Sequence, residues 1–410
     1  MPKPLKVFFC DLTYDTIILV SDTIPINIGF IGSYAKSIFN ENISVKLFKY
    51  PQEAIDAIKE EKPDLICLSN YSWNSNLSEY VASIAKKANP NVVTAQGGPN
   101  LPHDDAQQID FLISRPSTDI FMIMEAEMTT VNVINRIIDS KLNRKKIFSS
   151  SIDGAIFIRP ESSQPNKLYK GEASSRIKHL DEIPSPYLNG MLDHFFDGNL
   201  TPFIETNRGC PFRCSFCHTG DDYFNKIHKF SDERIIAEIE YIAKKAGALG
   251  ISNLHIADTN YGMYPRDREI TQALLDAHNK YNWPNSIMAT TGKNQKQRVI
   301  DITSMLGNMF SVNMSAQSMD ENVLANIRRS NISLDAYKDI NQHLKESGRS
   351  TKAELIMLLP GETKESFING ISEIIDSGIA SLTIYTLMLL HGTEFKDPEY
   401  RKRFGYEGKF

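Results

Sequence analysis

The chain has 410 residues, of which 41% are hydrophobic and 23% are charged, so it can build cores of ordinary size and is not a disordered protein. Its formal charge of −5 gives no indication of a nucleic-acid partner. No apolar run reaches the ~20 residues of a membrane-spanning helix, and the N-terminus lacks the apolar run of a signal peptide. Five cysteines do not fit a secretory disulfide framework, so we expect a cytoplasmic protein with no membrane span.

Strand-like and helix-like runs alternate in the first third of the chain. Apolar runs predict strands at 6–12, 44–50, 64–71, 91–100 and 119–124, with helical patterns between them. This alternation predicts an α/β domain over 1–142, with a doubly wound, Rossmann-like parallel sheet. Cys10 and Cys67 fall inside predicted strands, so we interpret them as core residues.

The loops after these strands are rich in Gly, Asn, Ser and aromatic residues, which suits a large flat ligand that carries amides. Sheets of this kind bind ligands at the carboxyl ends of their strands. Gly97, Gly98 and Pro99 either let a ligand approach the backbone closely or simply end a strand. No G-x-G-x-x-G motif follows the first strand, so a dinucleotide fingerprint is absent.

Residues 143–196 are richer in polar and proline residues, and we interpret them as a linker or interdomain segment with a short hairpin. A strand then runs from about Pro202 into a loop, and a helix begins near Ser231, which can act as its N-cap.

The loop between them holds three cysteines, Cys210, Cys214 and Cys217, in a C-x-x-x-C-x-x-C arrangement. A structural zinc site needs four ligands, and the neighbouring His218 would complete it only with strained geometry. A [4Fe–4S] cluster normally takes four thiolates, so three would leave one iron open to another ligand. The spacing favours such a cluster, with zinc and unligated thiols as the alternatives.

This cysteine motif, with Phe216 before its last cysteine, resembles the signature of the radical S-adenosylmethionine (radical SAM) enzymes. The resemblance implies a [4Fe–4S] cluster on Cys210, Cys214 and Cys217, whose open iron binds S-adenosylmethionine. It also implies an external electron donor of the flavodoxin or ferredoxin type. Reductive cleavage would then give a 5′-deoxyadenosyl radical that abstracts hydrogen from a substrate.

Later segments, at 255–262, 314–329, 354–363 and 382–395, resemble successive strands of the same family, although each alone also fits a turn or a helix cap. Their order implies a partial (β/α)6 TIM-type barrel over 197–396, followed by a short tail at 397–410. The resemblance implies that S-adenosylmethionine contacts Phe216, Asp258, Asn260, Ser315 and Gln317.

A wound α/β domain before such a barrel resembles the cobalamin-dependent branch of this superfamily. The resemblance places cobalamin contacts in the loops of the first domain, at Ser69, Tyr71, Trp73, Asn74, Gly97, Gly98, Pro99, Asn100 and Glu125. The chain also departs from that branch, because Met124 and Ala126 stand where related proteins often have glycine.

The D-x-H-x-x-G motif that supplies a histidine to cobalt in many cobalamin proteins is absent. We interpret His103 and His194 as ordinary surface or interface residues. The sequence therefore predicts cobalamin without a histidine lower ligand.

The expected function is methyl transfer from methylcobalamin to an unactivated carbon of a small molecule, lipid or sugar. A cobalamin-dependent cyclase or rearrangement enzyme, and a non-catalytic cobalamin sensor or carrier, are the alternatives. No residue is assigned as a catalytic acid or base. The chain stops soon after the sixth predicted strand, so we expect an open substrate site or one completed by a partner.

Overall fold

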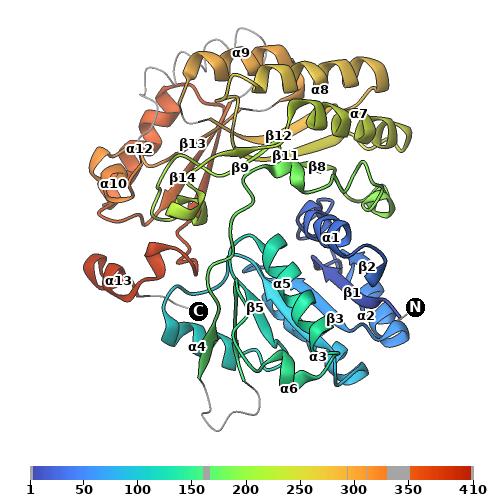
Figure 1. Cartoon of the computed structure of the whole chain (residues 1–410). Coiled ribbons are helices and arrows are strands. Elements are labelled where there is room, and N and C mark those ends of the chain that lie inside the picture. Colours follow the sequence, from blue (N-terminus) through green and yellow to red (C-terminus); the bar gives the residue numbers. More distant parts are fainter. Residues whose placement is uncertain (1–2, 160–166, 293, 311, 330–350, 408–410) are drawn as a thin grey trace. The chain divides into compact units, whose positions relative to one another are not determined.

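The computed structural model describes residues 3–159, 167–292, 294–310, 312–329 and 351–407, with the side chains of 312–314 left out. The chain divides into two compact units, Met1–Phe195 and Phe196–Phe410. Figure 1 shows the elements of each unit.

The first unit is built on one sheet, whose five leading strands are parallel and run in the order β2-β1-β3-β4-β5. These strands are β1 (Leu5–Cys10), β2 (Ile43–Phe48), β3 (Leu65–Ser69), β4 (Val93–Gly97) and β5 (Ile120–Met122). The fold class predicted from the alternating pattern, a doubly wound parallel sheet, is confirmed.

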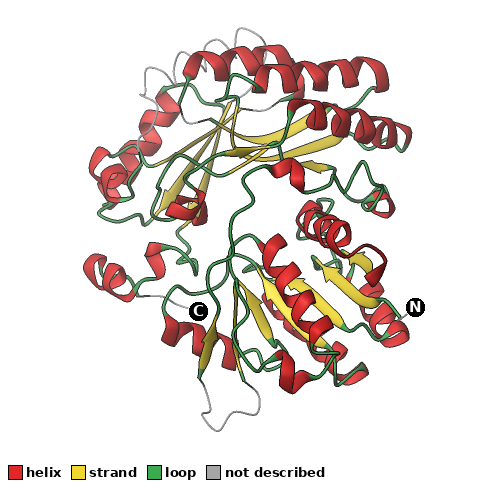
Figure 2. Ribbon diagram, in the orientation of Figure 1, coloured by secondary structure: helices red, strands yellow, loops and turns green. Residues whose placement is uncertain are grey.

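Helices connect the strands, as parallel pairing requires. They are α1 (Ile26–Phe39), α2 (Pro51–Glu61), α3 (Ser75–Ala88), α4 (Asp105–Ile113) and α5 (Ala126–Asp139), with the short helices η1 (Asn40–Asn42) and α6 (Arg144–Ile147). Helix α1 packs beside α5, and α2 packs beside α3, so helices flank the strands on both sides (Figure 2). Pro51 occupies the first turn of α2, where its missing N–H costs no hydrogen bond.

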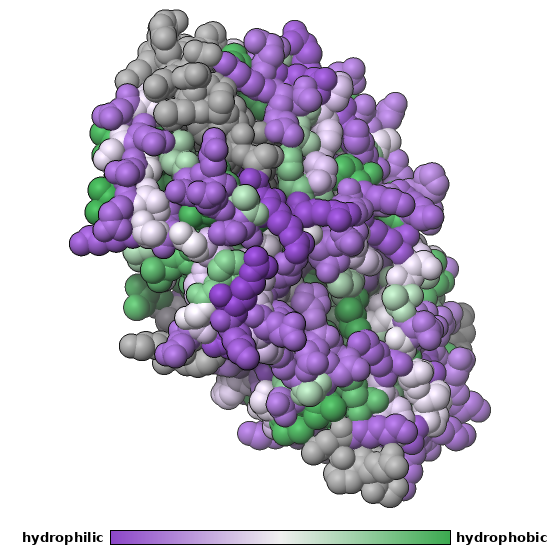
Figure 3. All heavy atoms as spheres, turned by 90° about the vertical axis from the view of Figure 1, so that its left-hand side faces the viewer, coloured by the Kyte–Doolittle hydropathy of each residue, from purple (hydrophilic) through white to green (hydrophobic). Residues whose placement is uncertain are grey.

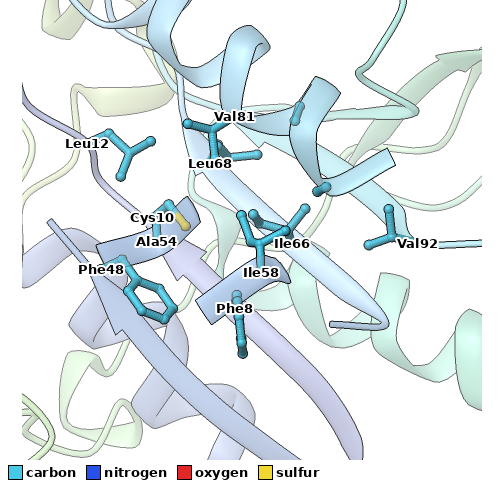
Figure 4. Close-up of a cluster of buried hydrophobic side chains, with 12 residues drawn as sticks. Phe8, Cys10, Leu12, Phe48, Ala54, Ile58, Ile66, Leu68, Val81 and Val92 are labelled. Carbon is cyan, nitrogen blue, oxygen red and sulfur yellow. The ribbon is translucent and has the colours of Figure 1, made fainter. Parts of the chain in front are cut away.

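The core of this unit forms between the sheet and α2 and α3 (Figure 4). Phe8, Ile66 and Ile58 are almost fully buried in one cluster, and the sulfur of Cys10 lies among these carbon side chains. Cys10 is 0% exposed and Cys67 is 4% exposed. Both cysteines are therefore packing residues of the core, as predicted.

The segment after α6 belongs to the first unit rather than forming a separate linker. Strands β6 (Ala155–Ile158) and β7 (Leu168–Lys170) form the predicted hairpin and extend the sheet, β6 pairing antiparallel with β5. Ile156 is buried against Phe111 and Phe121, which explains why the hairpin joins the sheet. The segment continues through η2 (Leu180–Glu182) and η3 (Asp193–Phe195).

In the described part of the second unit, six parallel strands lie in chain order in two three-stranded sheets. They are β8 (Phe203–Ile204), β11 (Asn253–Tyr261), β12 (Ser286–Thr291), β13 (Val312–Gln317), β14 (Thr351–Met357) and β15 (Ser381–Thr386). A parallel bridge between Ile287 and Phe310 links the two sheets. This order is that of the expected partial (β/α)6 barrel.

The helices of this unit follow its strands, and α7, α8 and α9 lie along one side of β11 and β12 (Figure 1). They are α7 (Asp232–Ala248), α8 (Asp267–Tyr281), α9 (Lys296–Leu306), α10 (Glu321–Asn326), α12 (Lys364–Asp376) and α13 (Pro398–Phe404), with η6 (Gly307–Met309) and η7 (Glu394–Lys396). Ser231 caps α7 as predicted, its side chain accepting a hydrogen bond from the Arg234 amide. The predicted C-terminal tail contains helix α13, so part of it is ordered structure.

No helix in the described part of the chain is long and apolar enough to span a membrane. On the face shown in Figure 3, hydrophobic residues form separate patches among hydrophilic ones.

Candidate functional site

The three clustered cysteines lie in a loop that follows β8 and is closed by a short antiparallel ladder. Strand β9 (Asn207–Arg208) enters the loop and pairs with β10 (His228–Lys229), which leaves it. Inside the loop, the amide of Cys210 donates to the carbonyl of Phe224 at 2.8 Å, and the amide of Cys217 donates to the carbonyl of Cys214 at 3.1 Å. These backbone bonds fix the loop without using the thiols.

Two glycines allow the loop its path. Gly209 has a φ of 113°, in the region that favours glycine. A Cβ at Gly220 would lie 2.2 Å from the carbonyl oxygen of Cys214, so only glycine fits against the loop backbone there.

Each thiol of the loop has its own polar partner. Cys210 and Cys214 are buried and Cys217 is partly exposed, and all three are free. The amide nitrogen of Asn260 lies 3.4 Å from the sulfur of Cys210, and Nη1 of Arg329 lies 3.9 Å from the sulfur of Cys214. The sulfur of Cys217 lies 3.2 Å from the hydroxyl of Thr219. The donor set is therefore three sulfurs, each beside a polar group, which fits an iron–sulfur cluster.

The zinc alternative finds no support in the geometry. Among the described residues, no group of three or more His, Cys, Asp or Glu side chains gathers so as to hold one metal ion. A cubane cluster differs from a single ion because each thiolate binds a different iron, so its ligands do not converge on one point.

The cysteine loop rests on the C-terminal end of α10. The amide of Ser215 donates to the carbonyl of Ile327 at 3.1 Å. Phe216 packs against a buried cluster that includes Ile327 and Phe395, with its ring 6.4 Å from that of Phe395. The side chain predicted to lie beside the adenine is thus held in place by α10 and the C-terminal segment.

Both carboxylate oxygens of Asp258, near the end of β11, accept hydrogen bonds from the segment that precedes the cysteines. Its Oδ1 accepts the Thr206 amide at 2.8 Å, and its Oδ2 accepts the Thr206 hydroxyl and the Asn207 side-chain amide, the latter at 2.7 Å. Burial raises the pKa of Asp258 to about 7, although the Thr206 hydrogen bonds oppose this change. Asp258 therefore positions the entry to the cysteine loop.

Asn260, two residues further along β11, is 1% exposed and connects this strand to the cysteine loop. Its nitrogen donates to the Cys210 sulfur and to the Thr259 hydroxyl, while its oxygen is buried without a hydrogen-bond partner among the described residues. A buried amide oxygen without a hydrogen-bond partner, beside a candidate cluster ligand, indicates an acceptor for a missing donor. Asp267 closes the next turn by accepting the amides of Gly262 and Tyr264.

The second sheet presents a polar row across its three strands. Ser315 on β13 donates to Glu354 on β14 at 2.7 Å, and Tyr385 on β15 lies 3.4 Å from the same carboxylate. Burial, followed by the Glu354 charge, raises the pKa of Tyr385. Gln317 follows a register irregularity in β13 and has a φ of 69°, so its side chain leaves the regular alternation.

In the first unit, the loop after β3 is organised by Asn74, which is fully buried. Its oxygen accepts the amide of Tyr71 at 2.8 Å, and its nitrogen donates to the hydroxyl of Ser69 at 2.9 Å and to the carbonyl of Leu12. The rings of Tyr71 and Trp73 stack 4.5 Å apart. Trp73 remains 49% exposed, so this loop presents a flat aromatic surface.

The loop after β4 lies against the same segment. Gly98 has a φ of 142°, and a Cβ there would lie 2.5 Å from the carbonyl oxygen of Asn70. Asn70 also donates to Gln96 and accepts from Asn100 at 3.1 Å. The Gly97-Gly98-Pro99 sequence therefore does more than end a strand, since it lets two neighbouring loops touch through their backbones.

Glu125, after β5, forms an ion pair of 2.9 Å with Arg176 from the interdomain segment. The second oxygen of Glu125 is buried without a partner among the described residues. His103 is exposed, and the ring of His194 lies 3.3 Å from the carbonyl oxygen of Leu47.

Several residues near these loops were not found from the sequence. Thr206, Asn207, Glu354 and Arg329 were assigned no role from the sequence, although Arg329 ends the segment 314–329 and Glu354 begins the segment 354–363. For Thr206 and Asn207, the usable signal was their position after a predicted strand and before the cysteine loop.

Comparisons with known proteins agree with this arrangement. A model of the radical SAM superfamily matches residues 204–374. The chain is 31% identical over 400 residues to the cobalamin-dependent radical SAM methyltransferase TokK of Streptomyces tokunonensis, a match that covers 93% of this chain and 56% of TokK. It is 28% identical to the 2-(S-pantetheinyl)-carbapenam-3-carboxylate methyltransferase of Streptantibioticus cattleyicolor, again over 93% of this chain and 56% of that protein. The chain thus spans about half the length of these curated relatives.

Solved structures show the same fold. The radical S-adenosylmethionine methyltransferase TsrM from Kitasatospora setae superposes with a TM-score of 0.70 at 12% identity, over 96% of this chain and 74% of TsrM. The cobalamin-dependent S-adenosylmethionine radical enzyme OxsB superposes with a TM-score of 0.65 at 14% identity, over 98% of this chain and 56% of OxsB. In its cysteine loop, in the order of its two folds and in these matches, the chain is similar to the cobalamin-dependent radical SAM enzymes, and its residues 204–374 match the radical SAM superfamily.

Proposed function

We propose that this protein is a cobalamin-dependent radical SAM methyltransferase that acts on an unactivated carbon of a small molecule, lipid or sugar. The observation that carries the proposal is a loop of three free thiols after the first strand of a six-stranded barrel, in a chain that aligns over 93% of its length with a methyltransferase of this family. When bound, the cluster supplies the electron that cleaves S-adenosylmethionine, and cobalamin supplies the methyl group.

In this proposal, Cys210, Cys214 and Cys217 hold the cluster. Their loop is fixed by backbone hydrogen bonds, so the thiols stay available for iron. Three thiolates would leave one iron of the cluster open, and the amine and carboxylate of S-adenosylmethionine would bind there.

The residues around the loop bind and orient S-adenosylmethionine. We propose that the Asn260 side-chain oxygen accepts a hydrogen bond from the amino group of S-adenosylmethionine, since this oxygen is buried beside Cys210 and has no donor among the described residues. Phe216 packs beside the adenine, and Ser315 and Gln317 contact the ribose or methionyl part. Asp258 does not contact S-adenosylmethionine in this proposal, but it fixes the segment before the cysteines through hydrogen bonds from Thr206 and Asn207.

Cobalamin is proposed to bind the first unit at the carboxyl ends of β3, β4 and β5, where the ligands of such sheets lie. Asn74 and Ser69 stabilise the loop that presents Tyr71 and Trp73. Gly97, Gly98, Pro99 and Asn100 provide backbone that a corrin can approach closely, and Glu125 contributes a buried oxygen without a partner.

The predicted lack of a histidine lower ligand remains part of this proposal. His194 already faces the carbonyl of Leu47, and His103 is exposed. A cobalt without a nitrogen donor would differ in its reduction and methyl-transfer behaviour, because axial ligands tune the metal. Electron paramagnetic resonance of the cobalt(II) form should show no nitrogen splitting from a protein histidine, and such splitting would overturn this point.

The proposed enzyme takes its electrons from an external donor of the flavodoxin or ferredoxin type and works in a reducing cytoplasm. The five free cysteines of the described residues are compatible with such a compartment.

The decisive experiment uses S-adenosylmethionine with a deuterated methyl group. The protein is reconstituted without oxygen with iron, sulfide and cobalamin, reduced, and offered candidate substrates, beginning with the pantetheinyl carbapenam named for one relative. A product that carries the label supports methyl transfer. Cleavage to 5′-deoxyadenosine with an unlabelled, isomerised or cyclised product would identify a rearrangement enzyme, and no cleavage at all would favour a cobalamin sensor or carrier.

A further inference from the structure

A buried arginine lies beside the cysteine loop, and the backbone of α10 puts it there. Helix α10 ends in a Schellman motif, in which the Arg328 amide donates to the carbonyl of Ala325 at 3.1 Å and the Arg329 amide donates to that of Leu324 at 2.9 Å. The left-handed residue of this motif is Arg328, with a φ of 52°. The turn directs the two neighbouring arginines to different surroundings.

Arg329 is 8% exposed, whereas the side chain of Arg328 is 59% exposed and pairs with Glu394 at 2.7 Å. The guanidinium of Arg329 donates through Nη2 to the carbonyl of Ser315 at the end of β13. Its Nη1 lies 3.9 Å from the sulfur of Cys214. A single planar group thus joins the barrel strand to a proposed cluster ligand.

The guanidinium group of Arg329 is a cation, so it places a positive charge beside this sulfur. Charges interact strongly where water is excluded. The reduction potential of an iron–sulfur cluster depends on net charge, hydrogen bonds to sulfur and solvent exposure, and Arg329 changes the first two.

We propose that Arg329 is a positioning residue that raises the reduction potential of the cluster by holding a buried positive charge against Cys214. This inference rests on the cluster in the proposed function. On reduction, one electron from a low-potential one-electron donor enters the cluster, and the guanidinium stabilises the added negative charge. No bond to Arg329 forms or breaks.

The test compares Arg329→Gln and Arg329→Lys with the matched control Arg328→Gln, which removes the same charge from the adjacent, exposed residue. Each protein is reconstituted anaerobically, its iron is measured, and its midpoint potential is determined by redox titration followed by electron paramagnetic resonance, without S-adenosylmethionine. We expect a more negative potential in Arg329→Gln at unchanged iron content, a smaller shift in Arg329→Lys, and none in Arg328→Gln.

An iron-loaded Arg329→Gln variant with the parent potential would overturn the role of Arg329, as would an equal shift in Arg328→Gln. Loss of iron from both Arg329 variants, with the control intact, would instead make Arg329 a structural support of the loop and would also overturn the inference. A parent protein that binds no iron would contradict the proposed function itself, so the two failures are distinguishable.

Discussion

The side chain of Asn260 donates a hydrogen bond to the sulfur of Cys210 at 3.4 Å, while its own oxygen is buried without a partner in the described structure. One side chain thus faces a proposed iron ligand with its nitrogen and keeps an acceptor free. This pairing connects the end of β11 to the cysteine loop and makes Asn260 the residue where cluster and S-adenosylmethionine would meet.

Replacing Asn260 with alanine should weaken S-adenosylmethionine binding about tenfold, the effect of losing roughly one hydrogen bond. Iron content should stay close to that of the parent, because all three cysteines remain. The affinity is measured from the change that S-adenosylmethionine causes in the spectrum of the reduced cluster. Asn322→Ala, on the exposed side of α10, is the control. Equal affinities in the two variants would argue against the contact.

Asp258 should make the stability of the apoprotein depend on pH. Because burial raises its pKa from 3.8 to about 7, the folded protein holds this proton more tightly than the unfolded chain does. Its contribution to the free energy of unfolding is therefore complete below 3.8 and is lost as the pH rises to about 7. Denaturant unfolding across this range measures the slope.

Asp258→Asn should flatten that pH dependence and lower the free energy of unfolding by about 2 kcal/mol, since an amide nitrogen would face the Thr206 or Asn207 donors. Asp276→Asn, on exposed positions of α8, should change neither quantity. A pH slope that persists in Asp258→Asn would assign it to another group.

Gly98 and Gly97 offer a matched pair in the first unit. Gly98→Ala should destabilise the protein by about 1–3 kcal/mol, because its φ of 142° and the 2.5 Å approach to the Asn70 carbonyl exclude a side chain. Gly97→Ala should cost less than about 1 kcal/mol, since its Cβ would meet Met122 at an ordinary 3.4 Å. The free energy of unfolding and the cobalamin affinity of both variants check this. Equal losses of stability in the two variants would contradict the special role given to Gly98.

The five cysteines should separate into two classes on alkylation of the apoprotein. Burial raises the pKa of the thiols of Cys10 and Cys67, so few thiolates form there. Cys217, which is partly exposed, should react with iodoacetamide well before them and should be protected once iron and sulfide are bound. Mass spectrometry of the labelled peptides gives the order. Labelling of Cys217 that the cluster fails to slow would speak against its role as a ligand.

Hydrophobic periodicity was sufficient to predict the parallel sheet of the first unit, whereas the strand order of the second unit was inferred from resemblance to a known family. The alternating pattern is local, and the rules that connect parallel strands leave few topologies. The hairpin β6–β7 was also predicted, but its pairing with the sheet was not, because Ile156 packs against Phe111 and Phe121, which are distant in sequence.

The site shows the same division. Cys210, Cys214 and Cys217 lie close together in one loop, so their spacing could be interpreted from the sequence alone. Glu354 and Arg329 lie at the ends of segments that were recognised, but their contacts depend on strand pairing and on the turn after α10, which the sequence does not show. The role of Asp258 also needed the structure, since its hydrogen bonds to Thr206 span 52 residues of sequence.

The measurement that tests the central idea most directly is the metal content of the anaerobically reconstituted protein, followed by spectroscopy of its reduced form with and without S-adenosylmethionine. We expect about four irons and four sulfides per chain and a spectrum that changes when S-adenosylmethionine binds the open iron. Zinc in place of iron, or a cluster whose spectrum ignores S-adenosylmethionine, would contradict the assignment of these three thiols.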